Sequence, residues 1–407
     1  MTARIAIVGA GVKTPVGNDL DSLWTALRAG VSSAARWDDE RLPRDADLLA
    51  CTINDFDAGQ YLTPTEARRL DRAHHLAIGA AQDAVDAFGD DLPEPERRAV
   101  VCGVGFGATA TYESQHERLL SQGIRGLSPL AIPMVMPSAA AAQLSMRFSC
   151  RGPSLTVSTA CASGANAIAE GVELLRRGAA DLVLAGGVDA MVTYNALCSF
   201  LRLDALSRHV IEPALASRPF DVDRDGFVMA EGAGFVVLER EADARAQRKE
   251  ILGVVSGYGV NSDAHHVVAP SPGGEGALRC MRLALQDAGL SPSDIGHVNA
   301  HGTSTQLNDL AEAEALTCLF GDSCPPVTAV KGATGHMIGG SGAVEAIVSL
   351  LSLRHGEAPP IAGLRQMDPR IEIDAVIAEP RTVRSAPVLS DSFGFGGTNA
   401  ALVLSLP

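Results

Sequence analysis

The spacing of apolar residues along this chain changes at regular intervals, and the changes predict alternating strands and helices. Short apolar runs rich in β-branched residues are typical of buried strands, and they occur at residues 4–9, 98–104, 154–159, 181–186 and 234–239. Apolar residues at helical spacing lie between them, at residues 20–30, 65–88, 139–148 and 165–178. This alternation predicts an α/β protein whose sheet is largely parallel and covered by helices.

The alternation begins again after residues 241–250, which are charged and helical in pattern, whereas residues 191–232 have no clear period. In the second series, strand-like runs occur at residues 251–259 and 295–300, and helical segments at residues 276–289 and 343–355. Residues 388–406 contain two further strand-like runs around a Gly-rich turn. Its order matches that of the first series, so we predict two repeats of one β/α unit. The predicted halves are residues 1–247 and residues 248–407.

Cys161 stands where the strand-like run 154–159 gives way to the helical segment 165–178. A cysteine at the N-terminal end of a helix lies at the positive end of the helix dipole, which favours the thiolate, the nucleophilic form. The alternative is that Cys161 is a small buried apolar residue, as free cysteines often are. Cys161 is therefore a candidate nucleophile that needs support from other residues.

Three Gly-rich segments place further polar groups at predicted strand ends, where α/β sheets bind their ligands. His301 follows the run 295–300, His336 lies in a loop before a helix, and residues 392–399 form a glycine turn between two strands. Each histidine taken alone is more often a structural residue. Together with Cys161, two imidazoles and a loop of free backbone N–H groups suit acyl transfer with stabilisation of an oxyanion.

Composition narrows the classes of function. The chain has 407 residues, of which 46% are hydrophobic and 20% charged, as in a globular protein. Its formal net charge of -15 argues against nucleic acid as a general partner. Because there is no apolar run of transmembrane length and no N-terminal signal sequence, we expect no membrane insertion and a cytoplasmic location. Eight scattered cysteines without a Cys-x-x-Cys pair predict reduced thiols and no metal site.

Four motifs follow one another along the chain: Thr159-Ala-Cys-Ala-Ser-Gly, Asn299-Ala-His-Gly-Thr-Ser-Thr, Lys331-Gly-Ala-Thr-Gly-His and Ser392-Phe-Gly-Phe-Gly-Gly-Thr-Asn. Together they resemble the motifs of elongating β-ketoacyl-ACP synthases, the ketosynthases of the thiolase superfamily. The resemblance implies an α/β, thiolase-like five-layer αβαβα fold from two repeated β/α halves, and an obligate dimer. It also implies that no cofactor is needed, because the substrates arrive on the phosphopantetheine arm of acyl carrier protein (ACP).

The resemblance further implies a decarboxylative Claisen condensation. Cys161 would take an acyl chain from acyl-ACP, malonyl-ACP would lose carbon dioxide, and the resulting enolate would attack the Cys161 thioester to give β-ketoacyl-ACP. His301 and His336 would donate hydrogen bonds to the malonyl thioester oxygen and so stabilise the enolate. Since the helix dipole favours the thiolate, we expect Cys161 to be acylated without a histidine base.

Supporting positions follow from the same resemblance. Lys331 and Glu345 match a charged pair near the second histidine, although the pair is also consistent with an ordinary buried ion pair. Thr303 and Thr305 match positions that contact the pantetheine arm of the carrier.

The glycine turn is expected to contribute backbone and aromatic groups. By the same resemblance, the backbone N–H groups of Cys161 and Phe395 would form the oxyanion hole. Phe395 resembles a gating phenylalanine between the acyl pocket and the malonyl side, and we group Phe393 of the same turn with it.

The kind of synthase stays open. Cys161 argues against chain-length factors, which typically carry glutamine at this position. Three hypotheses remain: a homodimeric fatty-acid synthase, a type II polyketide or polyene ketosynthase paired with a chain-length-factor homologue, and a noncatalytic scaffold or chain-length-factor-like subunit. Asp391 departs from the family pattern, because an asparagine usually precedes this Ser-Phe-Gly motif.

ACP is strongly acidic in such systems, so basic residues are candidates for its docking site. A docking role competes with a simpler interpretation, in which these side chains form solvated helix faces. The candidates are Arg68, Arg69, Arg72, Arg202 and Arg208.

Overall fold

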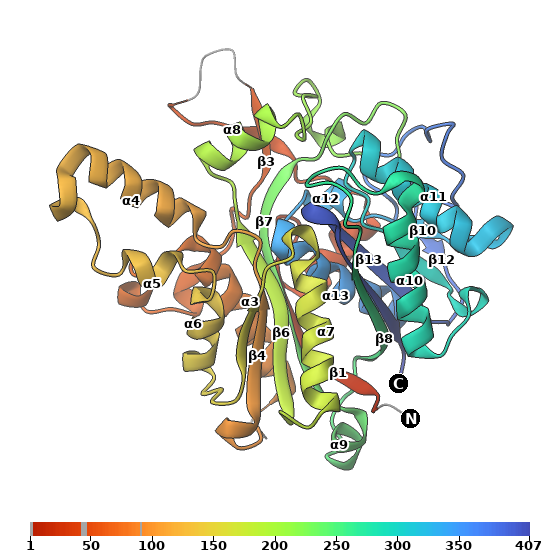
Figure 1. The fold of residues 1–407 in the computed structure, drawn as a ribbon, viewed down its shortest axis with the longest axis horizontal. Helices are drawn as coiled ribbons and strands as arrows, with labels where there is room; N and C mark the ends of the chain where they lie inside the picture. Colours follow the sequence, from red (N-terminus) through yellow and green to blue (C-terminus); the bar gives the residue numbers. More distant parts are fainter. Residues whose placement is uncertain (1–2, 42–46, 90–91) are drawn as a thin grey trace.

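The protein, described here by a computed structural model over residues 3–41, 47–89 and 92–407, is built from two halves with the same element order (Figure 1). The N-terminal half contains β1 (Ile5–Lys13), α3 (Arg72–Phe88), β4 (Arg98–Gly103), α6 (Ala139–Arg147), β5 (Ser154–Val157), α7 (Ser163–Arg176), β6 (Leu182–Ala190) and β7 (Met229–Arg240). The C-terminal half contains β8 (Gly253–Ser262), α10 (Glu275–Ala288), β9 (His297–Asn299), α11 (Gln306–Phe320), β10 (Val327–Thr328), α13 (Ser341–His355), β13 (Val388–Gly394) and β14 (Thr398–Ser405). The predicted repeat is confirmed.

The central strands form one continuous path whose order is symmetric about its centre, β10-β9-β13-β14-β8-β1-β7-β6-β4-β5; we call β10-β9-β13-β14-β8 the C-terminal sheet and β1-β7-β6-β4-β5 the N-terminal sheet. A short antiparallel pairing of Ile5–Ile7 with Gly253–Val255 joins the two halves. The prediction of a largely parallel sheet is wrong. β7 runs antiparallel to β1 and β6, and β14 runs antiparallel to β8 and β13, because the last strand of each half returns beside its predecessor instead of crossing over.

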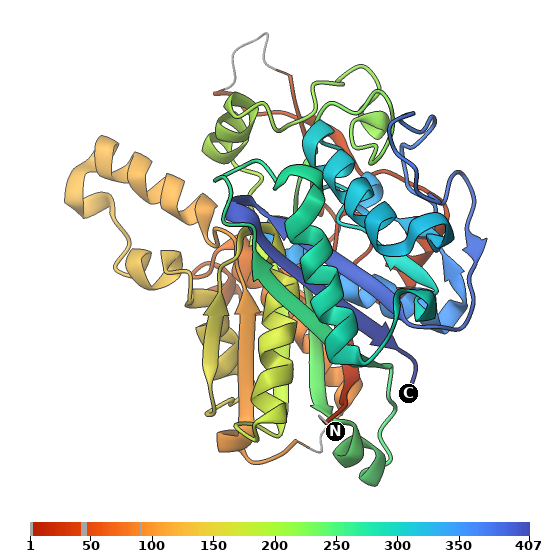
Figure 2. The same ribbon diagram turned by 45° about the vertical axis from the view of Figure 1, so that its right-hand side comes forward.

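Helices form three layers around the two sheets. α7 and α13 lie between the sheets, α3 and α6 cover the outer face of the N-terminal sheet, and α10 and α11 cover that of the C-terminal sheet (Figures 1 and 2). A central helix has to be buried on every side, and residues 341–353 of α13 are all buried. The expected five-layer αβαβα arrangement is confirmed.

Local sequence signals explain several element boundaries. Asp19 caps α1 (Leu20–Arg28), where its carboxylate accepts the Ser22 N–H. The predicted helix 65–88 is divided into α2 (Pro64–Ala67) and α3, because Asp71 caps a new start. Residues 241–250, expected at the boundary between the halves, contain α9 (Glu241–Ala246). Further short elements are the strands β2 (Ala35–Trp37), β3 (Leu48–Cys51), β11 (Glu357–Ala358) and β12 (Arg381–Thr382) and the helix α12 (Lys331–Thr334).

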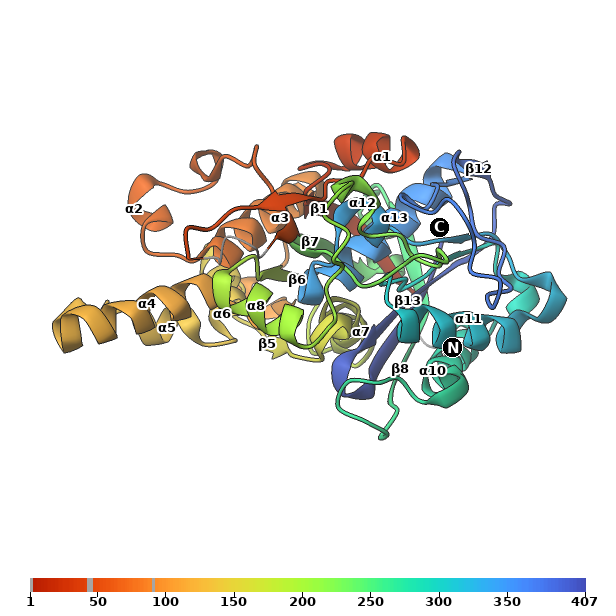
Figure 3. The same cartoon turned by 90° about the horizontal axis from the view of Figure 1, so that it is seen from above.

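Three helices were not predicted as such. α11 and α8 (Tyr194–Arg202) lie in stretches without a recognisable period. α4 (Thr109–Gln122) lies within residues 108–137, for which the sequence predicts a loop and a short helix. α4 and α5 (Ala131–Val135) form an arm that projects from the body of the molecule, as the view from above shows (Figure 3). Within the described residues, no helix combines the length and the apolar character needed to cross a bilayer.

Candidate active site

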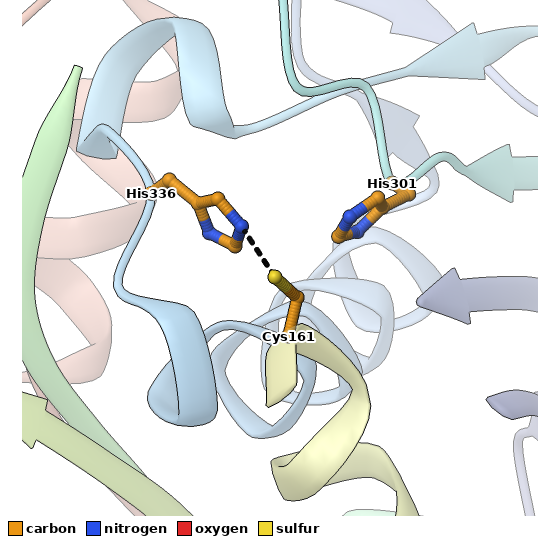
Figure 4. Close-up of side chains that lie close together, drawn as sticks. All are labelled: Cys161, His301 and His336. Atoms are coloured by element: carbon orange, nitrogen blue, oxygen red, sulfur yellow. Dashed lines mark hydrogen bonds between the residues drawn. The ribbon is translucent and has the colours of Figure 1, made fainter. Parts of the chain in front are cut away.

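The side chains of Cys161, His301 and His336 converge on one another (Figure 4). The Nε2 atom of His336 lies 3.0 Å from the Cys161 sulfur, and the centroids of the two imidazole rings are 5.6 Å apart. All three side chains are nearly inaccessible to solvent, with exposed fractions of 6%, 1% and 2%. The nucleophile comes from the N-terminal half and both histidines come from the C-terminal half, so the fold brings together the three residues singled out from sequence.

A sharp turn between β5 and α7 presents Cys161. The turn contains Ala160, whose φ of 50° is positive, and a 3-10 turn, Ala160–Ala162, leads directly into α7. Gly394 of the glycine turn packs against it, because a Cβ atom there would lie 3.2 Å from the Cys161 nitrogen and 2.7 Å from the Thr159 oxygen. Backbone geometry therefore fixes the sulfur at the N-terminal end of α7.

Burial opposes ionisation of this thiol. It raises the pKa of Cys161 to about 11, although the Lys331 charge and a hydrogen bond from the Phe395 backbone act in the opposite direction. Loss of hydration outweighs the stabilising groups in this pKa and so opposes the resting thiolate that the helix dipole favours. The Phe395 N–H points at the sulfur.

Lys331 determines the protonation pattern of His301. Its ammonium group contacts the Glu345 carboxylate, the His301 carbonyl oxygen at 2.6 Å and the His301 Nδ1 atom at 3.1 Å. An ammonium group has three hydrogens to donate and accepts none. Nδ1 of His301 is therefore an acceptor, and the neutral ring carries its proton on Nε2.

A backbone group has the same effect on His336. The Ile338 N–H donates to its Nδ1 at 3.3 Å, and the Ser341 hydroxyl lies 3.0 Å from the same atom. Because a backbone N–H only donates, the neutral His336 ring carries its proton on Nε2, which faces Cys161. Burial, followed by the Lys331 charge, holds the pKa of both histidines well below the usual range. Both rings are thus neutral N–H donors.

Several polar groups behind the site were missed from sequence. Glu312 and Asp391 each accept the His301 backbone N–H at 2.7 Å. Asp189 accepts four backbone N–H groups, those of Gly105, Phe106, Gly107 and Gly339. Burial raises the Asp189 pKa to about 6 in spite of these bonds. Asp391 directly precedes the glycine turn at residues 392–399, and the sequence singled it out only as a departure from the family pattern. Asp189 follows the predicted strand 181–186, and Glu312 lies in α11, a helix that the apolar pattern did not predict.

A cavity of about 270 Å³ opens onto the three residues. Phe393, Phe395, Thr303 and Thr305 line it together with Cys161 and both histidines, and the two threonine hydroxyls are 2.9 Å apart. Lys331 and Glu345 form a fully buried ion pair behind it. The cavity wall is completed by aromatic side chains of Phe106, Phe200 and Phe227.

The sulfur and ring nitrogens of the three central residues lie within 4.8 Å of one another, a spacing at which such atoms can ligate a metal ion. The hydrogen bonds to each Nδ1 leave a proton on Nε2, the atom that His336 directs at the sulfur. We therefore treat these groups as hydrogen-bonding groups and assign no metal to them.

The five arginines predicted for docking lie in different surroundings. Arg202 ends α8 and is exposed beside Leu203 and Asp204, which line the cavity, and Arg208 contacts Asp204 at 2.5 Å. Arg68 and Arg69 are exposed near α2, and Arg69 lines a separate hollow. The Arg72 guanidinium is bonded internally to Glu231 and the Ile53 carbonyl.

Comparisons with known proteins place this geometry in context. Residues 2–244 match the family model described as "Beta-ketoacyl synthase, N-terminal domain", and residues 252–365 match "Beta-ketoacyl synthase, C-terminal domain". A 3-oxoacyl-[acyl-carrier-protein] synthase 2 of Staphylococcus aureus (strain COL) is 38% identical over 407 residues, covering 98% of this chain and 97% of the relative. The protein of the same name from Synechocystis sp. is 37% identical over 410 residues with the same coverage.

Three solved structures cover 100% of this chain and of their own. The ishigamide ketosynthase/chain length factor has a TM-score of 0.90 at 33% identity. A beta-ketoacyl synthase from Burkholderia phymatum has a TM-score of 0.92 at 31% identity. A type II PKS acyl-carrier protein in complex with its ketosynthase bound to the hexaketide gives a TM-score of 0.91 at 25% identity.

We predict that alkylation of Cys161 by iodoacetamide accelerates about tenfold per pH unit without levelling off below about pH 10, because the thiolate is the reactive form and burial raises the pKa to about 11. Peptide mass spectrometry resolves the rate at each cysteine, and the exposed Cys318 is the internal reference. A Cys161 rate that levels off near neutral pH would contradict the prediction and restore the resting thiolate.

Proposed function

We propose a role for each active-site residue in the condensation reaction of this chain. The chain belongs to the β-ketoacyl synthase family. The chain is a β-ketoacyl-ACP synthase that acts in fatty-acid or polyketide chain elongation. The observation that carries the residue assignment is the cluster itself: one sulfur at a helix N-terminus faces two neutral imidazoles in a buried cavity. The cofactor-free reaction and the cytoplasmic location remain predictions from sequence.

In the first half-reaction Cys161 takes the acyl chain from acyl-ACP. Its sulfur attacks the thioester carbonyl, the carbon–sulfur bond to the carrier breaks, and the thiol proton ends on the departing pantetheine sulfur. No net proton is taken up by the protein. The Nε2–H of His336, 3.0 Å from the sulfur, stabilises negative charge on it as the proton leaves.

In the second half-reaction malonyl-ACP loses carbon dioxide and becomes an enolate. The Nε2–H groups of His301 and His336 donate to the enolate oxygen, and the buried surroundings strengthen these bonds. The enolate carbon attacks the Cys161 thioester, whose oxygen is received by the backbone N–H groups of Cys161 and Phe395. The new carbon–carbon bond forms, the bond to Cys161 breaks, and the thiolate takes up a proton.

The remaining predicted residues shape the cavity. We propose that Phe395 and Phe393 separate the acyl side from the malonyl side, where both rings line the wall. Thr303 and Thr305 would contact the pantetheine arm, since their hydroxyls also face the cavity. Lys331 and Glu345 would act indirectly, through the orientation and neutral charge of His301.

His301→Ala and His336→Ala are each predicted to retain acylation of Cys161 within about tenfold while losing condensation by a factor on the order of 100–1,000, the usual effect of removing one oxyanion donor. Intact-mass spectrometry of the acyl-enzyme and release of carbon dioxide from malonyl-ACP measure the two steps. Cys161→Ser is the control that abolishes acylation. If both histidine variants failed to acylate Cys161, the proposed division between acylation and condensation would be wrong. A wild-type chain that takes up no acyl group and does not condense would favour a noncatalytic or scaffold role.

For the carrier we propose docking at the mouth of the cavity, around Arg202 and Arg208, with Arg68 and Arg69 as a second contact. One of the structural relatives is a ketosynthase in complex with an acyl-carrier protein. Because the chain as a whole carries a net charge of -15, exposed arginines are the natural contacts for an acidic partner. Arg72 is left out because Glu231 already binds its guanidinium.

Arg202→Glu is predicted to raise KM for acyl-ACP several-fold and to leave turnover of a small acyl thioester unchanged, since charge reversal weakens only the encounter with the carrier. Arg177→Glu, at the far end of α7 from Cys161, is the matched control and should change neither. Equal losses with both substrates, or no loss with either, would count against docking at Arg202.

We also propose that the arm and the outer edge of β5 bind a second chain of the same fold, either another copy or a chain-length-factor homologue. β5 ends the sheet, and its Leu155 is 38% exposed. The arm lies on the same side of the molecule (Figure 2). Exposed apolar residues gather along it: Tyr112, Leu119, Leu120, Ile124, Leu130, Ile132 and Met136. Such a patch marks an association surface, and an unpaired edge strand can pair with another chain.

Ile124→Glu, at a side chain that is 83% exposed, is predicted to convert the dimer to a monomer in light-scattering chromatography. Leu283→Glu, on α10 and 42% exposed, is the control and should leave the dimer intact. A wild-type chain that dimerises only with a co-expressed homologue would identify the partner as a chain-length factor. A chain that stays monomeric under both conditions would overturn the proposal.

A further inference from the structure

The backbone N–H of His301 is shared by two carboxyl groups. Glu312 Oε1 and Asp391 Oδ1 both accept it, each at 2.7 Å. The other Glu312 oxygen accepts the Gly302 N–H at 2.8 Å. The other Asp391 oxygen is buried and has no hydrogen-bond partner among the described residues. One hydrogen therefore brings two acidic oxygens together directly behind a reacting histidine.

The pair is assembled from distant segments and is shut off from water. Glu312 comes from α11 and Asp391 from β13, and their exposed fractions are 1% and 0%. Two carboxylates this close cannot both stay ionised in a buried site, because their repulsion is not screened by solvent.

The charges that face the pair do not neutralise two carboxylates. Four titratable groups on the surrounding helices interact with the pair: Asp309 on α11, Glu345 on α13, Lys331 on α12 and the Cys280 thiol on α10. Lys331 is the cation of this group, and its three hydrogens are already donated to Glu345 and to two atoms of His301. The surroundings therefore favour at most one negative charge on the pair.

Proton binding supports the same conclusion. Burial raises the pKa of Asp391 to about 7. Burial, followed by the Asp391 charge, raises the pKa of Glu312 well above its usual range. A hydrogen bond between the two side chains accompanies these shifts.

We propose that Glu312 and Asp391 share one proton and that this singly charged pair is a positioning device that holds the His301 segment for condensation. The proton lies between the two side chains, and each carboxyl group also receives the His301 N–H. The inference rests on the role of His301 proposed above. The two residues act through His301 and do not touch the substrate.

The shared proton makes condensation depend on pH. The pKa of Asp391 is raised to about 7 and that of Glu312 is raised well above its usual range, so the last proton on the pair is lost only as the pH rises through the higher of the two pKa values. Two adjacent negative charges would then repel each other and attract the Lys331 ammonium away from His301 Nδ1, which it contacts at 3.1 Å. Condensation on a pre-acylated enzyme should therefore decline on the alkaline side, while the acyl group itself stays in place.

Asp391→Asn separates this proposal from a simple structural role. The amide has nearly the same shape, keeps an oxygen for the His301 N–H and supplies its own N–H to an ionised Glu312. An asparagine also usually precedes this motif in the proteins that the sequence resembles. The variant should condense at least as fast as the wild type at pH 7, and its alkaline decline should move up by more than one pH unit. Asp86→Asn, an exposed position on α3, should leave the profile unchanged.

Infrared spectroscopy tests the proton itself, independently of activity. At pH 7 the difference spectrum of wild type against Asp391→Asn should show the C=O stretch of a protonated carboxylic acid lost in the variant. Glu312→Gln should lose the same band, and Asp86→Asn should keep it. A difference spectrum without this band, or an alkaline limb that does not move in Asp391→Asn, would overturn the proposal. Failure of wild-type Cys161 to acylate would instead contradict the proposed function and leave the infrared result intact.

Discussion

The buried ammonium of Lys331 is the interaction on which the rest of the site depends. It is fully inaccessible, and each of its three hydrogens has a partner, one on Glu345 and two on His301. A cation in such surroundings is retained only when it is paired. In return it keeps His301 Nδ1 an acceptor, lowers the pKa of both histidines and moderates the raised pKa of Cys161. One charge thus adjusts three titratable groups in the same direction, toward neutral imidazoles and a less basic sulfur.

The repeat explains why the reacting groups come from different halves. Cys161 follows β5 and precedes α7, whereas His336 follows β10 and precedes α13, so the two residues occupy equivalent positions in the two units. α7 and α13 lie side by side in the middle layer. The N-terminal ends of both helices therefore meet at the cavity, one with the nucleophile and one with a hydrogen-bond donor. His301, after β9, then completes the site from the second unit alone.

Sequence predicted the parts of the structure in which one physical signal dominates. The apolar runs located the strands, and the glycine-rich strand ends located Cys161, His301 and His336. α11 was not predicted because its inward face carries the buried residues Asp309 and Glu312 in place of apolar ones. Their carboxyl groups accept backbone N–H groups of a neighbouring loop. Residues 191–232 escaped for a related reason: Arg224 is buried between Asp309 and Asp368, so long-range ion pairs replace a periodic apolar face. The effect of burial on the Cys161 pKa could not be predicted, because local sequence reveals a helix terminus but not the depth at which the thiol is buried.

Asp189 has a mechanical consequence for the cavity. Its carboxylate binds three N–H groups of the segment 105–107 and one of Gly339, the residue three positions after His336. One wall of the cavity carries Phe106 and the opposite half of the molecule carries His336. A shift of either segment must break bonds to a buried carboxylate or carry the other segment with it. The segment 105–107 and the segment of Gly339 therefore move as one unit when an acyl chain fills the cavity.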